Sequence, residues 1–347
     1  MRFLRAVFWA AALLLPSASM AGNVETAQRF ASDFIVPRFQ SVAAAAHAQS
    51  AAWSAFCANR KHGNIETLKK AFNDLADAWS DVEFMRIGPA AIALRVERFN
   101  WWLDRTDATG KALTQMLAVT DPQMLTPEKL ATGSVAGQGL PVVERLLYPA
   151  DAAALLKADD GAQHCTVGAA VTTAQGAIAD QIVSDWTAPD GARAALMANT
   201  RFRFSFADAN EAASVMLTDL VAGVEGLKDL KVAMMFHDIN NPAAPRLAEA
   251  SRSERTLRDI GRNLAAIRLA LETYFVPASA AQRNQIDMAF DDAEHTIRKL
   301  EAAKAEPDRI AASKLAVGSF SALAQQMIVV LPQATGLTLG FNNLDGD

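Results

Sequence analysis

The stretch NIETLKKAFNDLADAWSDVEFM, residues 64–85, indicates the fold class of this chain. Its apolar side chains recur at steps of three and four residues: Ile65, Leu68, Phe72, Leu75, Trp79 and Val82. That spacing places them on one face of an α-helix. Asn64 directly precedes the first of them and is suited to cap the helix N-terminus. The stretch therefore predicts an amphipathic helix.

The same periodicity extends through most of the chain. Apolar stripes with helical spacing also occupy residues 209–235, 257–271, 280–302 and 308–330. Period-two alternation is confined to residues 201–206, which predicts one short strand. We therefore predict an all-α fold with little or no sheet.

Two prolines predict where individual helices start and bend. Pro89 is placed to open a helix that runs on through Trp101 and Trp102, because proline is tolerated in a first helical turn. A helix that begins near Val24 is expected to kink at Pro37, which lacks the backbone N–H that an α-helix uses.

A break between two halves is predicted at residues 187–191, with the sequence TAPDG. We therefore expect two helical bundles, an N-terminal one at 24–188 and a C-terminal one at 189–347. Within the second bundle, Ser251 or Ser253 is a candidate N-cap for the helix at 257–271.

The N-terminus has the pattern of a secretory signal peptide. Arg2 and Arg5 supply positive charge, residues 6–15 are uncharged and mainly apolar, and Ser19-Met20-Ala21 offers small residues for cleavage after position 21. We predict a leader at 1–21 and a soluble periplasmic protein, with an N-terminal membrane anchor as the alternative. No cysteine directly follows the apolar run at the cleavage site, so we expect no lipid anchor.

The net charge of the chain limits which kinds of molecule it is expected to bind. The chain carries 33 lysine and arginine residues against 38 aspartate and glutamate residues, a formal charge of -5. Removal of the predicted leader leaves 31 against 38, a charge of -7. Nucleic-acid binding needs a basic surface, so no nucleic-acid partner is expected. The balance would tolerate a cationic ligand.

The chain has two cysteines, Cys57 and Cys165. An even number in an exported protein predicts a disulfide, because that compartment is oxidising. Two buried free thiols are the alternative.

Familiar catalytic motifs are missing from the sequence. It contains no His-Glu-x-x-His and no Gly-x-Ser-x-Gly, so neither a zincin site nor a nucleophile elbow is predicted. The histidines do not pair at helical spacing and occupy scattered positions: 47, 62, 164, 237 and 295.

The segment GQGLPVVERLLY, residues 137–148, stands out instead. Glycines lead into Pro141 at a first helical turn, and Glu144 follows within that turn. The partial positive charge of a helix N-terminus favours an ionised glutamate there. An ordinary acidic residue at a helix start is the alternative interpretation.

This segment resembles the signature of the imelysin-like family, Gly-x-His-x-x-Glu. Gly139 matches the glycine and Glu144 the glutamate, whereas Pro141 occupies the histidine position, as in the iron-regulated protein A-like branch. Shorter matches to that branch lie at Phe56-Cys57, at Trp79 before residues 86–89, at Ser251-Arg252-Ser253 and in the tail at 340–347.

The resemblance implies a two-domain, all-α protein of the periplasm or outer membrane that serves iron acquisition. It also carries the label of a metallopeptidase, from an insulin-cleaving member. Because proline has no imidazole, a His–Glu metal pair cannot form here. The resemblance therefore favours binding of iron, or of an iron-bearing ligand, with a membrane iron-uptake component as a possible partner.

The expected site lies at the cleft between the two bundles. Its candidate binding residues are Trp79, Arg86, Gly139, Glu144, Arg252 and Ser253. Glu144 is the candidate metal ligand, and Arg86 or Arg252 is its expected ion-pair partner when no cation is bound. Ordinary ion pairing between bundles and, for Trp79, simple core packing are the alternatives. A zinc peptidase and a helical module that binds only a protein partner are the competing functions.

Overall fold

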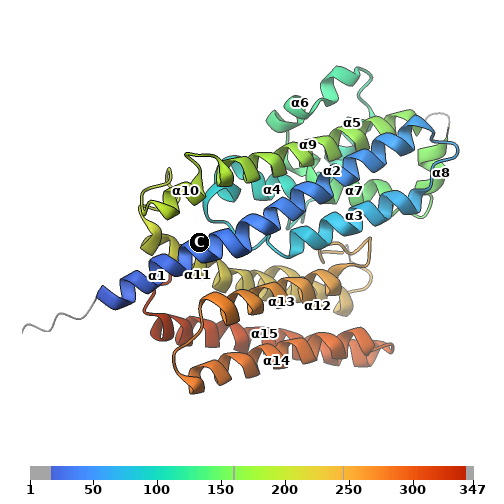
Figure 1. The fold of residues 1–347 in the computed structure, drawn as a ribbon. Coiled ribbons are helices and arrows are strands. Elements are labelled where there is room, and N and C mark those ends of the chain that lie inside the picture. The colour runs from blue at the N-terminus through green and yellow to red at the C-terminus, as the bar shows by residue number, and fades with distance from the viewer. Residues whose placement is uncertain (1–16, 159–160, 245, 341–347) are drawn as a thin grey trace, which may run out of the picture.

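The computed structural model describes residues 17–158, 161–244 and 246–340 (Figure 1). Most of the predicted leader and the tail at 341–347 lie outside the described residues. The described part of the chain contains α-helices, with short 3-10 and π segments, and no β-strand. The predicted all-α fold is confirmed.

The longest feature of the N-terminal half is a continuous helical path. It consists of α1 (Ser17–Phe30), the π-helical segment η1 (Ala31–Ile35) and α2 (Val36–Ala58). Two long helices pack against α2, namely α3 (Ile65–Ser80) and α9 (Ala162–Thr187). These helices form the framework on which the shorter elements of this half are carried.

Short elements connect α3 to α9. The 3-10 segments among them are η2 (Gly88–Leu94), η3 (Pro122–Leu125) and η4 (Val135–Gly137). The helices are α4 (Arg95–Phe99), α5 (Ala108–Leu117), α6 (Pro127–Thr132), α7 (Gly139–Leu147) and α8 (Ala152–Lys157). α7 packs against both α3 and α9.

The C-terminal half has seven described helical elements. They are α10 (Ala192–Met197), α11 (Ala209–Gly226), the π segment η6 (Leu227–Val232), α12 (Ala233–Asn240), α13 (Thr256–Tyr274), α14 (Ala280–Ala302) and α15 (Glu306–Thr335). α14 and α15 pack along each other at the base of the view in Figure 1, and α11, η6 and α12 pack against α15. One element of the described chain, α15, is long and apolar enough to cross a membrane.

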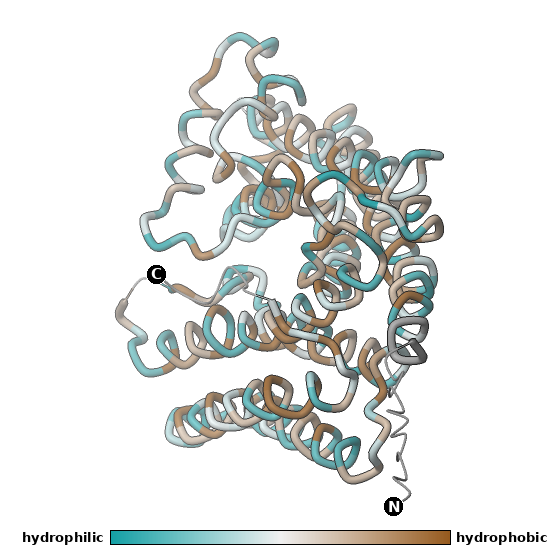
Figure 2. Tube along the Cα trace, turned by 90° about the vertical axis from the view of Figure 1, so that its left-hand side faces the viewer, coloured by the Kyte–Doolittle hydropathy of each residue, from teal (hydrophilic) through white to brown (hydrophobic). Residues whose placement is uncertain are grey.

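Several helix pairs join the two halves, two of them between long helices. α1 packs against α11, and α3 packs against α13. Figure 2 shows polar and apolar residues alternating along the helices of both halves, the pattern of amphipathic helices that bury one face. The buried apolar residues of the two halves join into one continuous core.

The predicted start of α3 is present, and a π segment precedes Pro37, the position where we expect a kink. The Asn64 side chain accepts a hydrogen bond from the Glu66 backbone N–H at 3.0 Å, as a cap does. η1 ends two residues before Pro37. A proline removes one α-helical donor, and a π segment is a common adjustment of the register around such a gap.

The predicted helix from Pro89 through Trp102 is wrong. η2 is interrupted at Ile92, which is extended, and at Ala93, which has a positive φ. α4 ends at Phe99, so both tryptophans lie outside it. A buried side chain stabilises this fold-back, because Arg95 donates to the Pro89 carbonyl at 2.9 Å and to Asp185 at 2.8 Å.

The predicted strand at 201–206 is also absent. Only an isolated bridge joins Phe202 to Phe206, because the chain turns at Arg203, whose φ is positive. Neither proposed serine caps α13, which begins at Thr256. Ser253 is engaged elsewhere, as described below.

The disulfide prediction is confirmed. Cys57 and Cys165 are bonded, with their Cα atoms 5.7 Å apart. The bond joins the end of α2 to the beginning of α9 and so fastens the two longest helices of the N-terminal half.

Candidate functional site

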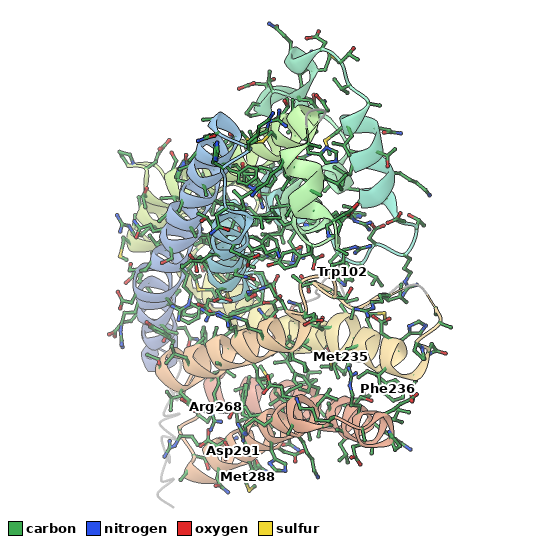
Figure 3. The ribbon with its side chains drawn as sticks, turned by 90° about the vertical axis from the view of Figure 1, so that its right-hand side faces the viewer. Trp102, Met235, Phe236, Arg268, Met288 and Asp291 are labelled. Carbon is green, nitrogen blue, oxygen red and sulfur yellow. A yellow bond between two sulfur atoms is a disulfide. The ribbon has the colours of Figure 1, made fainter. Side chains whose placement is uncertain are left out.

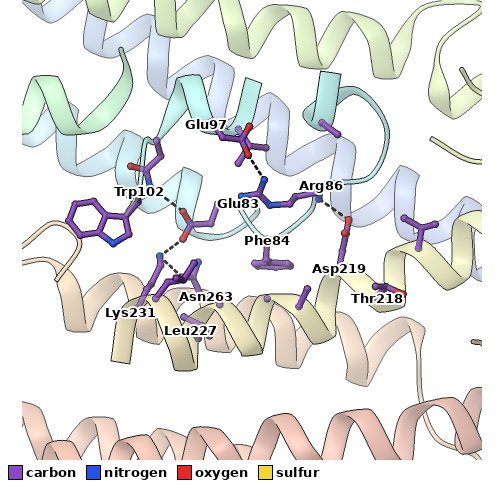
Figure 4. A pocket seen from close by; sticks show the side chains of 18 of the residues that line it. Glu83, Phe84, Arg86, Glu97, Trp102, Thr218, Asp219, Leu227, Lys231 and Asn263 are labelled. Carbon is purple, nitrogen blue, oxygen red and sulfur yellow. Dashed lines mark hydrogen bonds and ion pairs between the residues drawn. The ribbon is translucent and has the colours of Figure 1, made fainter. Parts of the chain in front are cut away.

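A cavity of about 670 Å³ lies between the two halves of the chain (Figure 4). We call it the main cleft. One wall comes from the end of α3 and residues 83–102, and the other from α11, η6 and α13. Figure 3 shows Trp102 between the two sets of helices, where it lines the cleft. The cleft therefore depends on both halves.

A largely buried lysine joins the two walls at one end of the main cleft. Lys231 forms ion pairs with Glu83 and, at 3.0 Å, with Glu249. Its ammonium also donates to the Asn263 side chain at 2.8 Å, and Asn100 donates to Glu249 at 2.5 Å. Figure 4 shows Lys231 reaching from the helix below to Glu83 above.

The electrostatics of this cluster keep the lysine charged. Burial alone would lower the pKa of Lys231, but the nearby carboxylates of Glu249 and Glu83 outweigh it and raise that pKa. Burial raises the pKa of Glu249, against the opposing effect of Lys231. The cluster is a satisfied set of opposite charges that connects the halves.

A second buried group lies further along the main cleft. Asp219, on α11, accepts hydrogen bonds from the backbone N–H groups of Arg86 and Ile87, both at 2.7 Å. The Arg86 side chain pairs with Glu97 at 2.5 Å. Burial raises the pKa of Asp219 to about 7, although both hydrogen bonds and the Arg86 charge act to lower it.

This shifted pKa predicts a pH-dependent stability. Between pH 4 and pH 7 the folded state retains the Asp219 proton and the unfolded state does not, so the free energy of unfolding falls as pH rises through that window. From pH 5 to pH 8 the wild-type free energy of unfolding should fall by about 1–3 kcal/mol because of Asp219. Asp219→Asn should not show this fall. Urea unfolding of both proteins at the two pH values measures this, and parallel pH profiles would contradict it.

Glu144 lies in a smaller cavity of about 30 Å³ beside the main cleft. The two cavities share wall residues, among them Trp79 and Glu249. Glu144 is 5% exposed, and its Oε1 accepts from the Ser253 backbone N–H at 2.9 Å and from the Ser253 hydroxyl at 2.6 Å. The expected arginine partner is therefore replaced by Ser253, since Arg86 pairs with Glu97.

The surroundings of Glu144 do not fit a bound metal ion. Iron or zinc needs several donors converging on one point. Within the described ranges, no three His, Cys, Asp or Glu side chains are gathered in that way. One Glu144 oxygen is already occupied by Ser253, and Pro141, which lines the small cavity, offers no ligand atom. The donor set therefore supports no metal-dependent step here.

Gly139 shapes the small cavity from behind. It begins α7 with a φ of +76°, which side chains rarely tolerate. A Cβ on it would lie 2.1 Å from the Phe99 carbonyl oxygen. Phe99 in turn stacks on Trp79, with ring centroids 4.2 Å apart. The glycine thus allows α7 to approach the chain segment that supports the cleft wall.

The structure places five of the six predicted site residues in or beside three cavities, and the sixth, Gly139, at the start of α7. Trp79 and Arg86 line the main cleft. Trp79 and Glu144 line the small cavity, where Ser253 bonds Glu144. Arg252 lines a separate cavity with Arg145.

Sequence reasoning missed the residues that join the halves, above all Lys231, Glu249 and Asp219. One signal was available. Lys231 continues the buried stripe formed by Leu220, Val224 and Leu227, so a charged residue occupies an apolar position of the helix. Such a position calls for a buried partner.

Comparison with known proteins agrees with this architecture. An imelysin-like protein from Psychrobacter arcticum 273-4 has a similar structure, with a TM-score of 0.70 and 17% identity over 93% of this chain and 98% of that one. A putative iron-regulated protein A precursor from Parabacteroides distasonis ATCC 8503 gives a TM-score of 0.73 and 14% identity, over 93% and 97%. No curated protein matches the chain.

The family comparison covers most of the sequence. The model of the family described as peptidase M75, imelysin, matches residues 35–329, which include both halves and all of the cleft except its rim at 338–340. The chain belongs to the imelysin family.

Proposed function

We propose that this protein serves iron acquisition outside the cytoplasm by binding an iron-bearing organic ligand in the main cleft. The observation that carries the proposal is the cleft itself, about 670 Å³ in volume and walled by both halves of the chain. Small-molecule sites have volumes of roughly 300–1,000 Å³, whereas a bare ion needs only a compact set of donors.

The walls of the main cleft favour a ligand with an apolar body. Phe84, Leu94 and Leu230 lie among the residues that line it. The indole rings of Trp79 and Trp102 add apolar area to the same walls.

The charges of the main cleft favour a neutral or cationic ligand over an anionic one. Its two cations, Arg86 and Lys231, are already paired with carboxylates. Glu211 adds a further acidic group to the lining. An anionic ligand would therefore meet uncompensated negative charge on binding.

Two further lines of support come from the relatives and the sequence. One structural neighbour carries the name of an iron-regulated protein A precursor. The N-terminal pattern predicts export, which suits the capture of iron in the periplasm and its delivery to a membrane iron-uptake component. Binding, rather than peptide cleavage, is proposed because Pro141 and Glu144 do not provide a metal-dependent peptidase site.

Filling the main cleft tests this function. Val215 lines the cleft on α11, and Val215→Trp would occupy part of it. The control is Val329→Trp, at a position on α15 that is 54% exposed and does not line the cleft. Quenching of tryptophan fluorescence by a cationic ferric trihydroxamate reports binding, because Trp79 and Trp102 line the cavity.

We expect Val215→Trp to weaken binding at least about tenfold, equivalent to 1.4 kcal/mol, and Val329→Trp to bind like wild type. Growth under iron limitation should follow the same order. If wild type does not bind the complex, or both variants bind equally, the proposal fails. Metal-dependent insulin cleavage by the wild-type protein would instead favour the peptidase, and capture of a protein partner alone would favour the helical module.

A further inference from the structure

A third cavity, of about 530 Å³, is lined by Arg252, the residue directly before Ser253. We call it the basic cavity. Its lining includes three cationic side chains from three elements: Lys111 on α5, Arg145 on α7 and Arg252 in the turn before α13. It shares no lining residue with the main cleft. Nothing in the proposed function uses it.

The charges of the basic cavity are only partly compensated. Arg145 pairs with Asp107 at 2.5 Å and lies 3.6 Å from Asp104. Asp104 is already engaged by the backbone N–H groups of Ala108 and Thr109, at 2.7 and 3.0 Å. Arg252 makes neither a hydrogen bond nor an ion pair with any residue that the structure describes, although the charges of Glu144, Asp107 and Asp104 act on it. Lys111 donates to the Thr106 carbonyl at 2.9 Å. In the described part of the chain, no carboxylate therefore pairs directly with Arg252 or Lys111.

The two arginines of the basic cavity act on each other. Burial lowers the pKa of Arg252 and the charge of Arg145 lowers it further, against the opposing charges of Glu144, Asp107 and Asp104. An anion between the two guanidinium groups would offset the effect of Arg145.

The turn that carries Arg252 is held in one conformation. Ala250 and Glu254 flank it with φ values of 50° and 58°, which non-glycine residues rarely adopt. The Glu144 carboxylate binds both the backbone N–H and the hydroxyl of Ser253. A turn with such unfavourable φ values persists only when surrounding contacts stabilise it. Two of these contacts come from Glu144.

We propose that the basic cavity binds a small polycarboxylate, and that Glu144 is a positioning residue that holds Arg252 toward it. Guanidinium groups match carboxylates with paired hydrogen bonds. The three cations come from separate elements around a space much larger than a single phosphate, so several carboxylates on one ligand fit them better than one compact anion. This site is independent of ligand binding in the main cleft.

The test is calorimetric titration of the purified protein with citrate, and with inorganic phosphate as the second probe. We expect citrate to bind, and Arg252→Gln and Lys111→Gln each to weaken it at least about tenfold. Arg193→Gln, which removes the same charge from an exposed position on α10, is the control and should bind like wild type. Val215→Trp in the main cleft should also leave citrate binding unchanged.

Two substitutions of Glu144 separate positioning from charge. Glu144→Gln keeps an oxygen that accepts from Ser253 and should retain most citrate binding, whereas Glu144→Leu should lose it. Equal citrate binding by Arg252→Gln and Arg193→Gln would overturn the site. Tight binding of phosphate with none of citrate would overturn the ligand class. A loss in Glu144→Gln as large as in Glu144→Leu would overturn the positioning role.

Discussion

Replacing Gly139 by alanine is expected to destabilise the protein by about 3–5 kcal/mol, because two costs combine at this position. The residue has a φ of +76°, and an added Cβ would lie 2.1 Å from the Phe99 oxygen and 2.8 Å from the Arg98 oxygen. Both obstacles are backbone atoms, so no side-chain rotation can remove the overlap. α7 or the segment at 98–99 must move instead.

The matched control for this substitution is Gly261→Ala. Gly261 lies inside α13, and a Cβ there would meet nothing within 4 Å. Alanine should therefore stabilise the helix at that position by about 0.5–1 kcal/mol. Chemical unfolding followed by circular dichroism measures both changes. Equal unfolding midpoints for the two variants would show that α7 accommodates the extra carbon without cost.

Lys231→Met is expected to cost about 3–5 kcal/mol, since it removes the only charge that compensates two buried carboxylates within its cluster. Glu83 and Glu249 both pair with Lys231 and are 14% and 10% exposed in their side chains. Without the lysine they would repel each other in a poorly solvated space. The loss should shrink at acidic pH, because protonation of either glutamate relieves the repulsion.

The control is Lys70→Met, which breaks an exposed pair with Asp74 on α3. Such surface pairs contribute about 0.5 kcal/mol or less, so this variant should unfold like wild type. Adding Glu83→Gln and Glu249→Gln to Lys231→Met should restore part of the stability, because no uncompensated charge then remains. A Lys231→Met protein as stable as Lys70→Met would mean that water reaches both glutamates.

Periodicity predicted the long helices well, because their buried faces repeat at the helical spacing. The prediction failed between Pro89 and Trp102, where tertiary contacts determine the backbone conformation. The Arg95 side chain bonds the Pro89 carbonyl and Asp185, which is 90 residues further along the chain. No local pattern carries that information, and a proline followed by apolar residues is equally suited to a helix start.

The candidate site was predictable only in part, for the same reason. Trp79, Arg86 and Gly139 stand out within short motifs, and the structure places them in or behind the cleft walls. The partner of Glu144 was not predictable, because Ser253 is separated from it by 109 residues. In the sequence Ser253 resembles a helix N-cap, but in the structure it donates two hydrogen bonds to the buried Glu144 carboxylate.

The path formed by α1, η1 and α2 has a mechanical consequence. In the predicted mature chain it spans residues 22–58 without a break, a length of about 56 Å at 1.5 Å per residue. One end packs on α11 in the second half, and the other packs on α3 and α9 in the first (Figure 1). Because this continuous helical path packs against both halves, its stiffness limits how far the halves can separate and how far the cleft can widen. The π segment at 31–35 interrupts the regular α-helical hydrogen bonding of this path, so we expect any bending to occur there.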